Sequence, residues 1–241
     1  MKYRKLMSLA ILVALWPCWV GRAKGALGNK VVDVDYLVTK FDAVTISKIT
    51  VAGQQIQPGL SSGPREDKSG KPFEEDEDWL NKMSIFLTNR TDKVIVCAEV
   101  ELWFPEIGDG SLGHPSTMYK ITVGERPEWS IYYRDGTKIQ PDPDRKLLFL
   151  APGETVEVPV ADYLVAIRDR IEEKMLFSKV SRVTLSRHNF YFADGMRWDA
   201  NSRGYYVPET GRPGHYTKLA EDFFPGRPSV PEKLAQNAKS E

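Results

Sequence analysis

Alternating apolar and polar positions recur along most of the chain and indicate a mainly β fold. In residues 82–88 every second position is apolar, and residues 93–104 form the strongest strand-like run in the chain. Residues 89–92 between them, Asn-Arg-Thr-Asp, are typical of a turn. We therefore expect these two runs to pair as an antiparallel hairpin.

Strand-like runs of the same kind recur on both sides of this hairpin. They occupy residues 31–38, 44–56, 119–123, 130–133, 146–150, 155–160, 180–192 and 204–207. Gly53, Gly153 and Gly195 mark turns, because glycine tolerates the positive φ that tight turns often need. A series of short strands separated by turns predicts an antiparallel β-sandwich.

One segment departs from this alternation and predicts a helix inserted between late strands. Leu164, Ile167, Ile171 and Met175 recur at spacings of three and four residues, which places them on one face of a helix. The segment spans about 162–176, and Asp162 is suited to cap its N-terminus. We expect the apolar face of this helix to pack against the sheets.

The first 25 residues predict export. A basic start is followed by an apolar run over residues 6–20 and by small residues at Gly21, Ala23 and Gly25, the pattern of a cleaved signal peptide. An uncleaved membrane anchor is the alternative. The apolar run is shorter than the roughly 20 residues that a membrane-spanning helix needs, so we expect cleavage and no stable membrane insertion afterwards.

The remaining chain is expected to form a single β-sandwich domain over residues 26–224. Within it, residues 57–78 are rich in glycine, proline and serine and end in an acidic run, which predicts a mobile loop. Residues 225–241 begin with a proline-rich stretch and end in polar residues, which predicts a disordered tail.

Charge and cysteine content narrow the range of partners. The whole chain has 33 basic and 33 acidic residues, and the leader holds five basic residues and no acidic one, so the remaining chain has a net charge of −5. A net negative protein is poorly suited to nucleic acid or anionic lipid. Cys97 is the one cysteine outside the leader, which excludes an intramolecular disulfide, and its apolar neighbours predict burial.

Three stretches of the chain carry a resemblance to a known kind of protein. Residues 89–95 (Asn-Arg-Thr-Asp-Lys-Val-Ile) and 150–156 (Leu-Ala-Pro-Gly-Glu-Thr-Val) resemble turn-to-strand motifs of bacterial secreted Ig-like domains. Residues 190–198, with Tyr205 and Tyr206, are similar to the closing signature of an uncharacterised secreted bacterial family. The resemblance implies that the mainly β fold is an Ig-like antiparallel β-sandwich and that the protein is exported, and it carries no catalytic residues.

The best candidate for a ligand site is an aromatic loop near the C-terminus. Carbohydrate sites use flat rings flanked by hydrogen-bonding side chains, and such residue types gather within nine positions: Trp198, Asp199, Asn201, Arg203, Tyr205 and Tyr206. The alternative is that these rings fill the core, as large aromatic side chains usually do. Exposure of the rings on one face would favour the binding interpretation.

Metal and catalytic motifs are weak, and we expect no cofactor. Asp142 and Asp144, and the acidic run 74–78, lack the spaced ligands of a calcium loop and read as solvated turns. The histidines are His114, His188 and His215, and strand alternation places His188 on the same face as Phe190 and Phe192.

Residues 89–91 match an N-glycosylation acceptor, and we interpret this match as accidental. It is expected to mark an exposed turn.

These observations favour an exported, non-catalytic binding or structural module that contacts envelope or extracellular proteins, in a periplasm or outside the cell. A carbohydrate-binding module using the Trp198–Tyr206 loop is the alternative, with polysaccharide as the partner. A hydrolase using distant carboxylates is a second alternative, because sequence spacing does not reveal whether two acids meet. Buried paired carboxylates in a cleft would favour the hydrolase.

Overall fold

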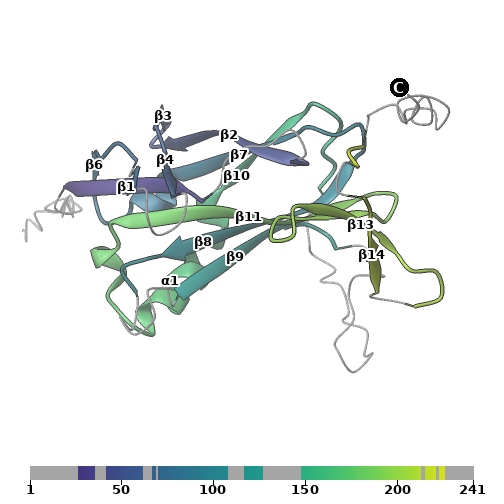
Figure 1. Cartoon of the computed structure of the whole chain (residues 1–241). Helices are drawn as coiled ribbons and strands as arrows, with labels where there is room; N and C mark the ends of the chain where they lie inside the picture. Colours follow the sequence, from purple (N-terminus) through teal and green to yellow (C-terminus); the bar gives the residue numbers. More distant parts are fainter. Residues whose placement is uncertain are drawn as a thin grey trace, which may run out of the picture.

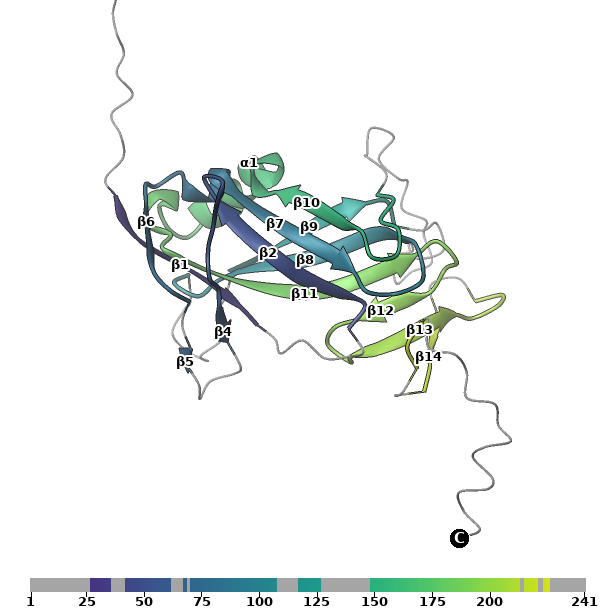
Figure 2. The same ribbon diagram turned by 90° about the horizontal axis from the view of Figure 1, so that it is seen from above.

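The computed structural model describes residues 27–35, 42–61, 67–68, 70–107, 117–126, 148–212, 215–220 and 223–225 of the 241-residue chain. In this part the fold is a β-sandwich with one short α-helix, as the sequence predicts (Figures 1 and 2). Three expected features lie outside the described residues: the signal peptide, the strand at 130–133, and the disordered tail, of which Pro225 alone is described.

The smaller layer, which we call the short sheet, contains four antiparallel strands within the described ranges. Its order is β10 (Thr155–Pro159), β7 (Met83–Asn89), β2 (Val44–Val51) and β3 (Gln54–Gln55). Gly53, with a φ of 78°, forms the predicted turn between β2 and β3. In β7 the alternation predicted from sequence is confirmed, because Met83, Ile85 and Leu87 are buried against the second layer.

The larger layer, the long sheet, is built around β11 (Arg182–Phe192). Its path runs from β14 (Tyr216–Lys218) through β13 (Gly204–Pro208), β12 (Arg197–Asp199), β11, β1 (Gly28–Val34) and β4 (Gly59–Ser61) to β5 (Asp67–Lys68). Beside this path, β8 (Ile95–Phe104) joins β11 to β9 (Thr117–Gly124), and β6 (Phe73–Glu75) pairs with β1. The pairing is antiparallel except that β1 runs parallel to both β11 and β4.

The predicted hairpin between residues 82–88 and 93–104 does not form. Strand β7 lies in the short sheet and β8 in the long sheet, so the turn between them carries the chain from one layer to the other (Figure 2). Asn89 is buried at this corner, where its side-chain amide donates to the carbonyls of Lys93 (2.7 Å) and Leu150 (3.0 Å) and its oxygen accepts from the Thr91 amide (2.9 Å). The glycosylation match therefore falls on a buried asparagine, whereas Arg90 and Asp92 of the same turn are exposed as expected.

The helix is shorter than predicted and begins differently. Helix α1 spans Leu164–Glu172 and follows a 3₁₀ turn, Val160–Tyr163, that contains Asp162, so Asp162 does not cap it. Ile167 and Ile171 are buried as expected, and the Tyr163 hydroxyl donates to the Thr122 carbonyl of β9 at 3.2 Å. No helix in the described part of the chain combines the length and the apolar character that a membrane crossing requires.

Two other segments differ from expectation. The segment 57–78, predicted to be a mobile loop, contributes β4, β5 and β6, although residues 62–66 and 69 lie outside the described part and its mobility stays a prediction. In the segment expected to form a strand at 146–150, the described residues 148–150 contain a single bridge, from Leu150 to Ile95.

A buried ion pair crosses the core between the layers. The Arg187 guanidinium of β11 lies 2.9 Å from the Asp42 carboxylate and donates to the Val44 carbonyl at the start of β2 (3.1 Å). The side chains of Arg187 and Asp42 are 4% and 1% exposed, so both charges depend on each other for neutralisation. This pair fixes the start of β2 against the centre of the long sheet.

The corner at Asn89 generates a stability prediction. We expect Asn89→Ala to lower the free energy of unfolding by about 1–3 kcal/mol, because it removes the acceptor of the Thr91 amide and one of the donors to the Lys93 and Leu150 carbonyls. Urea unfolding measures the loss, and Asn201→Ala at an exposed position is the matched control, expected to change stability by less than about 0.5 kcal/mol. Equal stability of the two variants would contradict the role of this corner.

Candidate functional site

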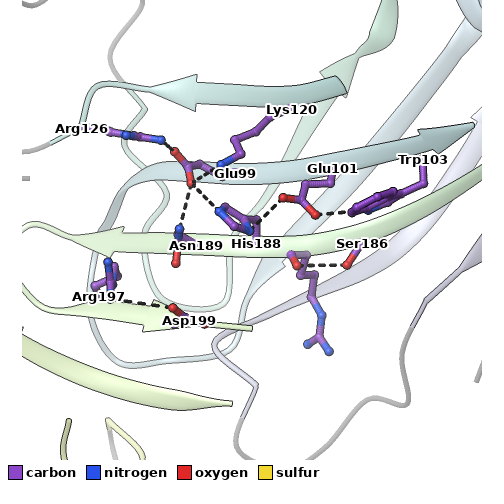
Figure 3. A network of polar contacts seen from close by, with 11 residues as sticks. Glu99, Glu101, Trp103, Lys120, Arg126, Ser186, His188, Asn189, Arg197 and Asp199 are labelled. Carbon is purple, nitrogen blue, oxygen red and sulfur yellow. Dashed lines mark hydrogen bonds and ion pairs between the residues drawn. The ribbon is translucent and has the colours of Figure 1, made fainter. Parts of the chain in front are cut away.

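The polar side chains of greatest chemical interest gather on the outer face of the long sheet (Figure 3). Strand β8 directs Val100 and Leu102 into the core, so by alternation Glu99, Glu101 and Trp103 point to the opposite face. We call this set, with its partners from β9 and β11, the outer-face network: Glu99, Glu101, Trp103, Lys120, Arg126, His188 and Asn189.

A β-bulge in β11 brings two adjacent side chains to this network. Arg187 pairs with Val100 and Phe190 with Ala98, so two residues of β11, His188 and Asn189, stand opposite the single residue Glu99. The extra residue reverses the alternation, and His188 lies on the outer face while Phe190 is fully buried in the core. The prediction that His188 shares a face with Phe190 and Phe192 is therefore wrong.

Glu99 is the centre of the network and is fully buried. Arg126 hydrogen-bonds its Oε1, and the Asn189 amide donates to its Oε2 at 3.1 Å. The Lys120 ammonium and the His188 Nε2 lie 3.8 Å and 3.7 Å from the same Oε2. A carboxylate taken out of water needs such partners, because an unpaired buried charge is strongly destabilising.

Glu101 continues the network along β8. Its Oε1 lies 3.0 Å from His188 Nδ1, and its Oε2 accepts a hydrogen bond from the Trp103 indole at 3.2 Å. Burial acts against ionisation of Glu101, but His188, the Lys120 charge and the Trp103 hydrogen bond together outweigh it and hold the pKa below its usual value. Glu101 is therefore an ionised acceptor at neutral pH.

Arginines and tyrosines border the network. The Arg197 guanidinium lies 5.1 Å from the centre of the Tyr206 ring and 4.5 Å from that of Tyr216. Arg126 lies 5.8 Å from the centre of the Tyr191 ring. Burial, reinforced by the nearby Glu99 charge, raises the pKa of Tyr191 to about 12, so this hydroxyl stays neutral in the physiological range.

The six residues of the predicted aromatic loop do not form one exposed face. Trp198 in β12 is 1% exposed and Tyr205 in β13 is 2% exposed, and Trp198 packs on Phe190 with ring centres 5.6 Å apart. Tyr206 is half-buried beneath Arg197.

The polar members of that loop are spread around the rings. Asp199 is half-buried, whereas Asn201 and Arg203 are exposed, and Arg203 adopts a φ of 47°. The structure therefore supports the alternative that the large rings fill the core.

The other candidate residues are not brought together into a site. Within the acidic run 74–78, Glu75 and Asp76 pair with Lys82 at 2.7 Å and 2.8 Å, and the described residues contain no group of ligands suited to a metal ion. Asp142, Asp144 and His114 lie outside the described residues, and His215 is exposed. Cys97 is buried, as predicted.

Sequence reasoning missed the two glutamates at the centre of the network. A usable signal was present, because Glu99 and Glu101 are two acids at alternate positions of an otherwise apolar strand. Two such residues share one face of the strand, so they need cations from neighbouring strands. The hydrophobic pattern did not reveal which strands lie on either side of β8.

The lowered pKa of Glu101 predicts how the protein responds to acid. Its carboxylate stabilises the fold above its unfolded pKa of about 4.3, and this contribution disappears as the pH falls through the lower folded value. We expect Glu101→Gln to be less stable than wild type at pH 7 and to lose less stability between pH 7 and pH 3. Urea unfolding at pH 7, 5 and 3 measures this, with the exposed Glu157→Gln as control; parallel pH profiles for wild type and Glu101→Gln would refute it.

The burial of Trp198 predicts a structural effect of its removal. We expect Trp198→Ala to cost about 3–5 kcal/mol of stability, since a large ring leaves a cavity against Phe190. Thermal unfolding and retention on immobilised polysaccharide are compared with those of Arg203→Ala, an exposed neighbour. A Trp198→Ala protein with unchanged stability that has lost glycan retention would overturn the packing role.

Comparison with known proteins identifies no relative of this chain. No protein-family model, no curated protein and no solved structure matches the chain. We therefore infer its function from the geometry of its own residues.

Proposed function

We propose that the protein is an exported, non-catalytic binding module that contacts another protein of the cell envelope or the extracellular space. The observation that carries the non-catalytic part is the outer-face network. Its two carboxylates contact Arg126, Lys120, His188 and Asn189, and these contacts join neighbouring strands of the long sheet. Export is supported by the leader pattern in residues 1–25.

A carboxylate-based hydrolase fits this network poorly. Such enzymes need a carboxylic acid whose pKa is raised so that it can donate a proton. Glu101 has a lowered pKa, and Glu99 is fully buried under its cation partners. The paired carboxylates therefore argue for a structural role.

A carbohydrate-binding role for the aromatic loop has lost its principal support. Stacking on a sugar needs an accessible ring face, and Trp198 and Tyr205 are both buried. Asn201 and Arg203 are exposed, but neither Trp198 nor Tyr205 offers an exposed ring beside them.

Protein binding is supported by the strand edges that the two sheets leave open. In the described part of the chain, β10 and β3 end the short sheet, and β6 has a single partner, β1. Open edges offer backbone hydrogen-bonding groups that can receive a strand from another protein.

Affinity capture tests the proposal. The full chain, tagged at its C-terminus and produced in its source organism, is used as bait against solubilised envelope and culture medium, and recovered protein and sugar are both quantified. We expect enrichment of a particular protein by at least tenfold, reversed by excess untagged chain. Recovery of polysaccharide without protein, or turnover of the captured material, would contradict the proposal.

A further inference from the structure

An open groove lies between two chain segments at one end of the molecule. It has a volume of about 440 Å³ and is lined by the β2–β3 hairpin on one side and residues 71–75 on the other. Val51, Ile56 and Phe73 supply its apolar surface. Strands β3 and β6 lie at this same end (Figure 1), and the volume is within the range of known ligand sites.

The backbone of β3 presents unused hydrogen-bonding groups beside this groove. Gln54 pairs with Val51, and the Ile56 amide donates to the Ile49 carbonyl at 3.1 Å. The backbone hydrogen-bonding groups of Gln54 and Ile56 are therefore directed toward β2. In an antiparallel ladder the intervening residue faces the other way, which directs the N–H and C=O of Gln55 away from β2. Nothing in the described part of the chain pairs with these two groups.

The opposite wall of the groove is a second open edge. Strand β6 pairs with β1, and no residue of β1 lines the groove. The Lys71 amide donates to the Gln57 carbonyl at 3.3 Å, which joins the two walls at one end. Beyond that contact the described residues show no pairing between β3 and β6, so the groove separates two strand edges.

Side chains around the groove suit a neutral, extended ligand. Gln54, Gln55 and Gln57 are exposed and offer amide donors and acceptors. Lys71 and Glu74 are exposed and of opposite sign, and the third charged residue of the lining, Glu75, is ion-paired with Lys82 at 2.7 Å, so the rim favours neither an anion nor a cation. Phe73 is held against Trp79 with ring centres 5.8 Å apart, which fixes the position of an apolar ring in the groove lining.

We propose that this groove binds an extended peptide segment of a partner protein by strand addition at the Gln55 edge of β3. The inference rests on the proposed function and names its contact surface. Main-chain hydrogen bonds to Gln55 would supply affinity, and an apolar side chain of the peptide would meet Ile56 and Phe73. The added strand would extend the short sheet by one strand.

The test exploits the direction of the Gln55 amide. Gln55→Pro removes an N–H that β2 does not use, and proline is tolerated at such an edge position, so the fold is expected to survive. Gln55→Thr changes the side chain and keeps the N–H. A random-peptide phage library is panned against the full chain, and the selected peptides are measured by fluorescence anisotropy against wild type and both variants, with thermal unfolding as the check on folding.

We expect Gln55→Pro to weaken binding of the selected peptides at least tenfold and Gln55→Thr by less than threefold. Hydrogen exchange supplies a readout independent of the variants, since a bound peptide should protect the amides of Gln55 and residues 73–75. Equal binding by wild type and Gln55→Pro, no peptide selected, or oligosaccharides protecting the groove in place of peptides would overturn the inference. If the captured partner binds Gln55→Pro as well as wild type, the binding-module proposal stands and this groove is not its site; if no partner is captured, the proposed function fails.

Discussion

The buried charge of Glu99 is the constraint on which the arrangement of the long sheet depends. A carboxylate with no access to water costs several kcal/mol unless it is surrounded by donors and cations. Here those partners come from three places in the chain: Lys120 on β9, Arg126 just after it, and His188 with Asn189 on β11. They reach Glu99 when β8 is flanked by β9 and β11 in the observed register. The bulge in β11 is part of this solution, because it delivers an imidazole and an amide to the same carboxylate from adjacent positions.

Strand β11 also helps to hold the two layers together, through the side chain of Arg187 on its other face. Immediately before the bulge, Arg187 points into the core and pairs with Asp42, beside the start of β2. At the far corner, Asn89 joins the end of β7 to the Leu150 carbonyl. Both contacts place polar groups inside the sandwich, where they are satisfied in one geometry and costly in others. We infer that they select the relative position of the sheets, whereas apolar packing supplies the bulk of the stability.

Local features of this fold were predictable from the sequence, and the pairing of distant strands was not. The alternation at Met83, Ile85 and Leu87 reports which face of β7 is buried, and Gly53 and Gly195 mark turns because both need positive φ. The turn at 89–92 was recognised, but a turn sequence does not say whether the next strand stays in the same sheet. The parallel pairing of β1 with β11 joins residues about 150 positions apart, beyond any local pattern. Within the candidate site, the aromatic residues were visible and proved to be core, while Glu99 and Glu101 became informative once β9 and β11 stood beside them.

The edges of the sheets differ in how they are protected, and this difference bears on function. The short sheet ends at β10 on one side and at β3 on the other, and β10 ends in Pro159. Proline, bulges and lysine are common means of preventing unwanted strand addition. At the groove, β3 shows none of these, and within the described part of the chain the N–H and C=O of Gln55 have no backbone partner beside an apolar surface. A sheet that protects one edge and leaves the other open beside a groove has the pattern expected where strand addition is used. That contrast, together with the engagement of both outer-face carboxylates by neighbouring side chains, is why we propose recognition by the backbone of β3 and a structural role for the charged side chains of β8.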